Sequence, residues 1–196
     1  MTEAGFAEPA ADAAHAFRAI MKAMARPGVV TGVPSALTPP APLLPAAAAI
    51  ALTLCDFQTP VWFSPRLANA ELAQYLRFHT GAPLVTDVSR ALFLFLTADD
   101  DTPALEDLAQ GTHEYPDRSA SLVIQVPGFH TGAIEIAGPG IPSPAGFGVA
   151  GIGSPFWQAL ERNHARFPLG VDVFFATSSS IAALPRSTAI RLKEAA

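Results

Sequence analysis

The first part of the chain carries apolar residues at helical spacing. Between residues 9 and 26 they recur at i, i+3, i+4 and i+7, while Arg18 and Lys22 lie off this stripe. The spacing predicts an amphipathic helix, which Pro27 and Gly28 then terminate. The predicted apolar stripe consists of Phe17, Ile20, Met21 and Met24.

Further segments also have helical patterns. Residues 45–56 are apolar on every side and rich in alanine, which favours a helix buried against a sheet over one at the surface. Residues 70–80 form a predicted helix that Asn69 caps and that Gly81 ends in a left-handed conformation. The remaining predicted helices are a short one opened by Thr102 and Pro103 and one around PFWQALERN.

Short apolar runs between these helices predict strands. The runs are VWF, ALFLFLTA, SASLVIQV, GAIEIAG and VDVFFAT. The segment from Gly138 to Gly153 is rich in glycine and proline and is expected to be a loop. Strands that alternate with helices in this way predict an α/β fold, with a mixed sheet flanked by helices on both faces.

Length and composition favour one folded domain. The 196 residues are 50% hydrophobic and only 15% charged, which is enough apolar material for a substantial core but short for two domains. Residues 1–8 are expected to form a disordered or loosely ordered tail. Residues 9–196 are expected to form the single domain.

The charge pattern excludes two classes of partner. A net charge of −5, with twelve scattered Lys and Arg residues, argues against binding to nucleic acid or to an anionic membrane. The N-terminal residues lack a basic start followed by an apolar core, and the longest apolar stretch, residues 42–54, falls short of the roughly 18 residues of a spanning helix. The sequence therefore predicts a soluble, cytoplasmic protein.

Two stretches that resemble catalytic motifs fail on context. His113 and Glu114 begin like the zinc motif HExxH, but Pro116 would break the helix and Asp117 occupies the second ligand position. A GxGxxG pattern within residues 146–151 has prolines on both sides. A dinucleotide fingerprint must instead follow a strand and open a helix, so a turn-rich connection is favoured.

The lysines, histidines and cysteine of the chain are few, and their positions do not favour a bound cofactor. The only lysines are Lys22, on the polar side of the first helix, and Lys193, in the C-terminal tail, so neither is placed to form the Schiff base of a pyridoxal-phosphate enzyme. The five histidines are too widely spaced to give a metal signature. Cys55 is the only cysteine, and its apolar neighbours favour a buried structural thiol over a nucleophile. No cofactor is expected.

Six motifs in a fixed order resemble one known family. They are FRAIMKAMARPG, FHTGAPL, GTHEYPDRSASLVIQV, AGPGI, RFPLGVDVFF and LPRST. The resemblance spans Phe6 to Thr188 and is to the PhnH subunit of bacterial carbon-phosphorus lyase. It implies a homodimeric α/β protein, similar in fold to the large domain of pyridoxal-phosphate-dependent transferases but without their cofactor.

The same resemblance implies a place in a complex. The partners would be the PhnG, PhnI and PhnJ subunits, which let bacteria use phosphonates as a phosphorus source. In that pathway an alkylphosphonate replaces adenine on the ribose of MgATP, and the radical chemistry that breaks the C–P bond belongs to PhnJ. The resemblance assigns no catalytic residue to this subunit, so a structural or site-completing role is expected.

Polar residues in turns are the candidate contacts for an anion or a partner subunit. Asp117, Arg118 and Ser119 stand at the entrance of the predicted strand SASLVIQV, and a structural loop in which Arg118 pairs with a carboxylate is favoured. Arg26 and Arg186 likewise favour pairing or helix capping over ligand binding. The alternative function is an independent transferase that acts on a phosphorylated compound through Arg118, Arg186 and Ser119.

Overall fold

A six-stranded mixed sheet forms the centre of the protein. A computed structural model describes residues 4–33 and 36–193. The strands of the main sheet are β1 (Thr31–Gly32), β2 (Val61–Phe63), β3 (Phe93–Thr97), β4 (Ser121–Gln125), β7 (Asp172–Ala176) and β8 (Ser180–Leu184). Their order is β1-β8-β7-β4-β3-β2; the last four run parallel, and β8 and β1 are each antiparallel to the strand they join.

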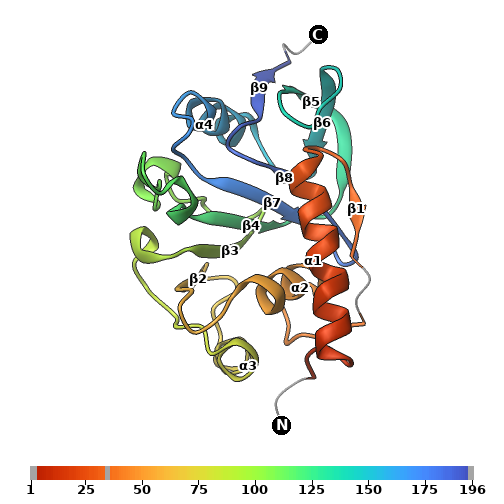
Figure 1. Ribbon diagram of the computed structural model, residues 1–196, viewed down its shortest axis with the longest axis vertical. Coiled ribbons are helices and arrows are strands. Elements are labelled where there is room, and N and C mark those ends of the chain that lie inside the picture. Colours follow the sequence, from red (N-terminus) through yellow and green to blue (C-terminus); the bar gives the residue numbers. More distant parts are fainter. Residues whose placement is uncertain (1–3, 34–35, 194–196) are drawn as a thin grey trace.

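Helices cover both faces of this sheet, as predicted. One face carries α1 (Pro9–Ala25), α2 (Pro45–Leu54) and α3 (Ala70–Thr80), and the other carries α4 (Ser154–His164). Figure 1 shows α4 and α3 at opposite ends of the molecule. Within the described residues, no helix is long and apolar enough to cross a membrane.

A second, three-stranded antiparallel sheet packs beside α4. Its strands are β5 (Phe129–Ala137), β6 (Ala145–Val149) and β9 (Ala189–Leu192), in the order β6-β5-β9. Thus the segment 138–153, expected to be a loop, contains a strand. The glycines and prolines of this segment favoured the prediction of a loop. However, β6 is an edge strand with a single neighbour, and such a strand tolerates glycines that a central strand would not. β1, β8 and β9 were also not predicted.

The parallel strands divide the core into two clusters. Because successive side chains of a strand point to opposite faces, Phe95 and Val123 pack against α1–α3, whereas Leu96 and Ile124 pack against α4 and the second sheet. The alanine-rich α2 is buried from Ala46 through Ala51, which confirms the prediction of a helix buried against the sheet, while residues 52–54 are partly exposed.

The predicted apolar stripe of α1 is only partly the buried face. The buried residues are Ala16, Ala19, Ile20 and Ala23. Phe17 is 46% exposed and Met21 is 51% exposed. The alanine face of α1 packs against alanine-rich α2, because small side chains let two helices approach closely. This close approach turns the larger apolar side chains of α1 outward.

Local signals at helix ends are confirmed. The side chain of Asn69 accepts a hydrogen bond of 2.8 Å from the backbone N–H of Leu72, and Gly81 ends α3 with φ of 72°. The short helix expected near Thr102 is a single 3-10 turn, η2 (Leu105–Asp107). Of the predicted tail, residues 1–3 lie outside the described residues, and Phe6 packs against the first core cluster.

Candidate functional site

A cavity opens between the β3–β4 connection and α4. It has a volume of about 340 Å³. Ala98 follows the end of β3, so the cavity begins at the carboxyl edge of the parallel strands, the edge where open α/β sheets usually bind ligands. Its apolar walls include Pro103, Leu105, Ile152, Pro155 and Phe156, and its polar side chains are Asp100, Asp101, Thr102, Glu106 and Arg162.

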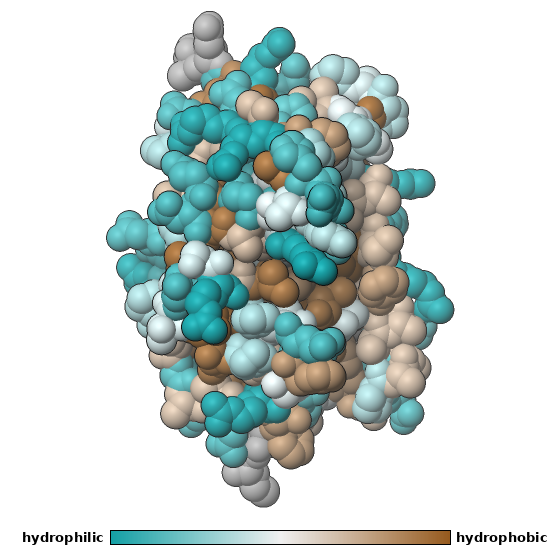
Figure 2. Space-filling model, turned by 60° about the vertical axis from the view of Figure 1, so that its left-hand side comes forward, coloured by the Kyte–Doolittle hydropathy of each residue, from teal (hydrophilic) through white to brown (hydrophobic). Residues whose placement is uncertain are grey.

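A second hollow, of about 190 Å³, continues this cavity along α4. The two hollows share Leu105, Glu106, Ala159 and Arg162. The second adds Gln110, Asn163 and Arg166. We call the combined hollow the α4 groove. In Figure 1 the chain between β3 and β4 lies on the left-hand side, near α4; that side comes forward in Figure 2, where apolar residues lie in a hollowed area bordered by hydrophilic ones.

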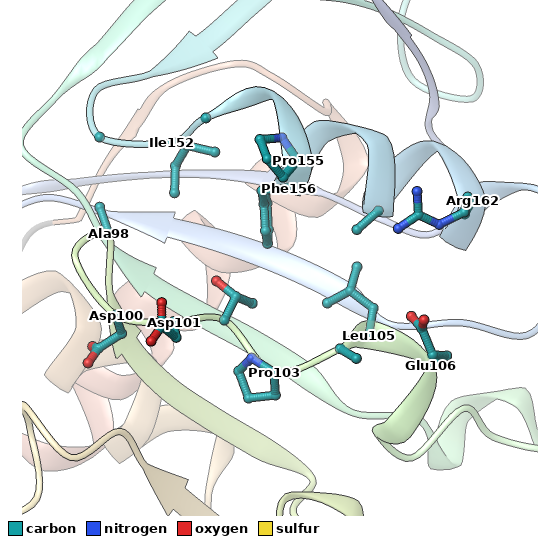
Figure 3. A pocket seen from close by; sticks show the side chains of 15 residues that line it. Ala98, Asp100, Asp101, Pro103, Leu105, Glu106, Ile152, Pro155, Phe156 and Arg162 are labelled. Atoms are coloured by element: carbon teal, nitrogen blue, oxygen red, sulfur yellow. The ribbon is translucent and has the colours of Figure 1, made fainter.

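The charged residues of the α4 groove differ in what they contact. Asp100 shapes the loop after β3, because its Oδ2 accepts hydrogen bonds from Ser64 Oγ at 2.7 Å and from the backbone N–H of Thr97 at 2.7 Å. Figure 3 shows Glu106 and Arg162 on facing walls at one end of the cavity. Asp100 is therefore structural, while Glu106 and Arg162 are exposed to whatever enters the groove.

A hydrogen-bond network surrounds the guanidinium of Arg186. Its Nε donates to Asp172 Oδ1 at 3.1 Å, its Nη2 donates to Asp172 Oδ2 at 2.5 Å, and its Nη1 donates to the carbonyl oxygen of Pro116 at 2.6 Å. The carbonyl oxygen of Arg186 lies 3.1 Å from His164 Nδ1. The network joins the turn after β8 to the start of β7, the end of α4 and the segment before β4.

The expectation that Arg118 forms the buried arginine–carboxylate pair is wrong. Asp117 and Arg118 lie in a 3-10 turn, η3 (Pro116–Arg118), and both are exposed. The Arg118 Cζ atom instead stands over the Tyr115 ring, 4.2 Å from its centroid. The largely buried pair is the one between Arg186 and Asp172, which forms because antiparallel pairing of β7 with β8 sets the start of one beside the end of the other.

The segment around η3 borders an open hollow of about 310 Å³. The hollow is lined by Pro116, Asp117, Phe167, Pro168, Asp172, Pro185, Arg186 and Ser187. Phe167 is 58% exposed and Tyr115 is 47% exposed. We call Tyr115, Pro116, Asp117, Arg118 and Phe167 together the η3 patch. It presents two aromatic rings and a guanidinium, the side chains most enriched at protein interfaces.

The other candidates from the sequence, Ser119 and Arg26, are not part of the exposed η3 patch. Ser119 follows η3 but is 7% exposed, and its Oγ is buried without a hydrogen-bond partner among the described residues. Arg26 follows the last turn of α1, where its backbone N–H donates to the carbonyl oxygen of Lys22. The structure therefore brings Asp117, Arg118 and Arg186 to one place and leaves Arg26 outside it.

The Cys55 thiol is a weak nucleophile, and the described residues hold no grouped metal ligands. Burial raises the pKa of the Cys55 thiol to about 12, with a smaller contribution from Asp56, so the thiolate is scarce at neutral pH. Across residues 4–33 and 36–193, no three His, Cys, Asp or Glu side chains group as metal ligands. Gly146 and Gly148 lie within β6 rather than after a strand, which is not the position of a dinucleotide-binding loop.

Residues 4–191 match the sequence profile of the family described as bacterial phosphonate metabolism protein (PhnH). This chain belongs to the PhnH family. It is 38% identical over 184 residues to the alpha-D-ribose 1-methylphosphonate 5-triphosphate synthase subunit PhnH of Rhizobium meliloti, a match that covers 93% of this chain and 92% of that protein. It is also 30% identical over 215 residues to the "Putative C-P lyase subunit protein HtxG" of Stutzerimonas stutzeri, covering 100% of this chain and 99% of that protein.

Sequence reasoning missed several residues that shape the sites of this PhnH family member. Asp172 lies within the motif RFPLGVDVFF, and a carboxylate that opens an apolar strand was a signal for a buried partner. Arg162 and Arg166 carried the signal of i, i+4 spacing near the end of a predicted helix. Glu106 had no comparable signal, because only the packing of η2 beside α4 makes it face Arg162.

Proposed function

We propose that this chain is the PhnH subunit of a carbon-phosphorus lyase core complex, required for phosphonate catabolism. The observation that carries the proposal is the near full-length match to a protein named as a subunit of alpha-D-ribose 1-methylphosphonate 5-triphosphate synthase. The complex would activate an alkylphosphonate with MgATP to ribose 1-phosphonate 5-triphosphate. The proposed partners are PhnG, PhnI and PhnJ.

Within that complex, a structural or site-completing role is favoured over independent catalysis. The alternative transferase would need Arg186 to hold a phosphate, but its guanidinium already donates to Asp172 and Pro116. The same alternative would need Ser119, whose Oγ is buried. The residues proposed for independent chemistry are thus either engaged or enclosed, which supports a subunit that acts through its surfaces.

The η3 patch is the proposed contact with a partner subunit. Tyr115 and Phe167 are exposed, and the Arg118 guanidinium is held over Tyr115. Arg186 anchors the patch from beneath through the carbonyl oxygen of Pro116. A surface held in place before binding loses less conformational entropy on association. This geometry suits a docking surface better than a mobile loop.

A homodimer is proposed as well, with the outer face of α1 as the contact between copies. Phe17 and Met21 are one turn apart on that face and are about half exposed, and Figure 1 shows α1 on the right-hand side of the molecule, beside β1. Glu8 precedes α1 and Arg26 follows it, both exposed. An antiparallel pairing would set the acidic end of one α1 beside the basic end of the other, as two-fold symmetry allows.

The likeness of this α/β fold to the large domain of pyridoxal-phosphate-dependent transferases is also a proposal, and no cofactor is expected. Lys22 and Lys193, the only lysines, are both exposed. A Schiff-base lysine is normally held inside a pocket.

The proposal is tested by complementation and copurification in the source bacterium. A strain that lacks the gene for this chain should fail to grow on methylphosphonate as its phosphorus source and should grow on inorganic phosphate. Tagged protein expressed from a plasmid should restore growth and copurify with the PhnG, PhnI and PhnJ subunits. Normal growth of the deletion strain on methylphosphonate would refute the function.

A further inference from the structure

We propose that the α4 groove binds a small organic phosphate or phosphonate, with its anionic group at Arg162 and Arg166 and its organic part in the cavity toward Asp101. The location of the site and the choice of its arginines follow from the geometry alone. The choice of a phosphorus anion over another anion rests on the proposed function. The site shares no residue with the η3 patch, which it adjoins where Arg166 precedes Phe167 in the chain. It is assigned by neither the family description nor the names of the relatives.

The two arginines form the anionic end of the site. Arg162 lies in the last turn of α4, Arg166 follows one helical turn later, and both line the same hollow. Neither has an ion-pair partner among the described residues, in contrast to Arg186, whose guanidinium is bound to Asp172. Two guanidiniums on one wall match a doubly charged phosphorus group, because each can donate paired N–H groups to its oxygens.

The rest of the groove suits the organic part of such a molecule. The larger hollow has about 340 Å³, within the range of roughly 300 to 1,000 Å³ typical of small-molecule sites. Apolar walls at Ile152 and Phe156 can enclose a sugar-sized group, while Asp101 at the far end can accept hydrogen bonds from hydroxyls.

Gln110 supplies an observation independent of the arginines. Its Nε2 donates to the carbonyl oxygens of Leu105 at 2.6 Å and Leu108 at 2.9 Å, which fixes the amide. Its Oε1 is buried and has no donor among the described residues. A buried acceptor without a donor is unfavourable, and a movement of this side chain that opened Oε1 to the hollow would let a ligand hydroxyl donate to it. Gln110 lines the same hollow as Arg162 and Arg166.

Glu106 should affect anion binding in the opposite direction from Arg162. It lies on the wall opposite Arg162 and lines both hollows. Its carboxylate therefore opposes an anion that approaches Arg162. Removal of this charge should strengthen anion binding, whereas removal of the Arg162 charge should weaken it. Nonspecific attraction to the protein surface would not depend on these two positions more than on others.

The test measures binding of ribose 5-phosphate to the purified full chain by calorimetry at constant ionic strength. Arg162→Gln and Arg166→Gln should each weaken binding about tenfold, the loss expected for one charge-assisted contact. Glu106→Gln should tighten it. The matched control is Arg77→Gln, which removes one exposed positive charge from α3 on the opposite face and should leave binding unchanged.

Several outcomes would overturn the proposal. They are an absence of binding at millimolar ribose 5-phosphate, an equal effect of Arg77→Gln and Arg162→Gln, or inorganic phosphate that binds as tightly as the sugar phosphate. A thermal melt of each variant checks folding, since all four positions are exposed. Copurification is scored separately: a chain that binds the probe but joins no complex refutes the proposed function, and a chain that joins the complex without binding the probe refutes the site.

Discussion

Arg186 and Asp172 form a double hydrogen-bonded ion pair in which each side chain is only 13% exposed. The pair joins the residue that opens β7 to the turn that follows β8, and Arg186 also reaches the carbonyl oxygen of Pro116. One side chain thus holds together three segments that are remote in sequence. Its removal would leave the Asp172 carboxylate in a largely buried position without its cation.

Arg186→Ala should therefore destabilise the protein. The loss of one partner from a buried pair costs roughly 3 to 5 kcal/mol, which for a domain of this size lowers the melting temperature by on the order of 10 °C. Arg186→Lys should recover part of the stability, because an ammonium group keeps the charge but not the forked geometry. Thermal and urea melts check both, and a wild-type melt for the alanine variant would show that the pair is not structural.

Arg118→Ala, in contrast, should leave the stability of the protein nearly unchanged. Its guanidinium is exposed and contacts the Tyr115 ring, so the variant should lose no more than about 1 kcal/mol of stability. If the η3 patch docks a partner subunit, the variant should melt like the wild type yet copurify poorly with the complex and support little growth on methylphosphonate. Normal assembly and growth with this variant would remove Arg118 from the proposed interface.

Charge on the outer face of α1 should dissociate the proposed homodimer. Phe17→Glu and Met21→Glu place carboxylates on exposed apolar positions, so neither should prevent folding, but each would bury a charge in an α1–α1 contact. Sedimentation velocity at micromolar concentration should show a dimer for the wild type and a monomer for both variants. Phe78→Glu, at an aromatic on α3 that is 70% exposed, is the control and should remain dimeric.

The Cys55 thiol should be inert in the folded protein. Burial raises its pKa from 9.0 to about 12, so a thiol reagent at pH 8 should label it only after unfolding. The sign for stability follows from proton binding. The folded state holds the thiol proton more tightly than the unfolded state. The contribution of Cys55 to the free energy of unfolding is therefore complete below pH 9 and is lost as the pH rises from 9 toward 12. Rapid labelling of native protein at pH 8 would contradict this picture.

The sequence predicted correctly those features that depend on neighbouring residues alone. The cap at Asn69 and the end of α3 at Gly81 depend on a few neighbouring residues, and both were predicted from them. The run of alanines in α2 predicted a helix buried against the sheet, because Thr53 is the only polar side chain of the helix and cannot by itself form a solvent-facing stripe. The six ordered motifs predicted the family, which the profile match over residues 4–191 confirms.

Tertiary structure alone decided which residues meet. Arg186 finds its partners 14 and 70 residues away, at Asp172 and Pro116, and no pattern near Arg118 could show that the buried pair would form elsewhere. The outward turn of Phe17 follows from the close fit of two alanine faces, α1 against α2. Sequence periodicity reports which residues share a face of a helix, but the neighbours that pack there determine which face is buried.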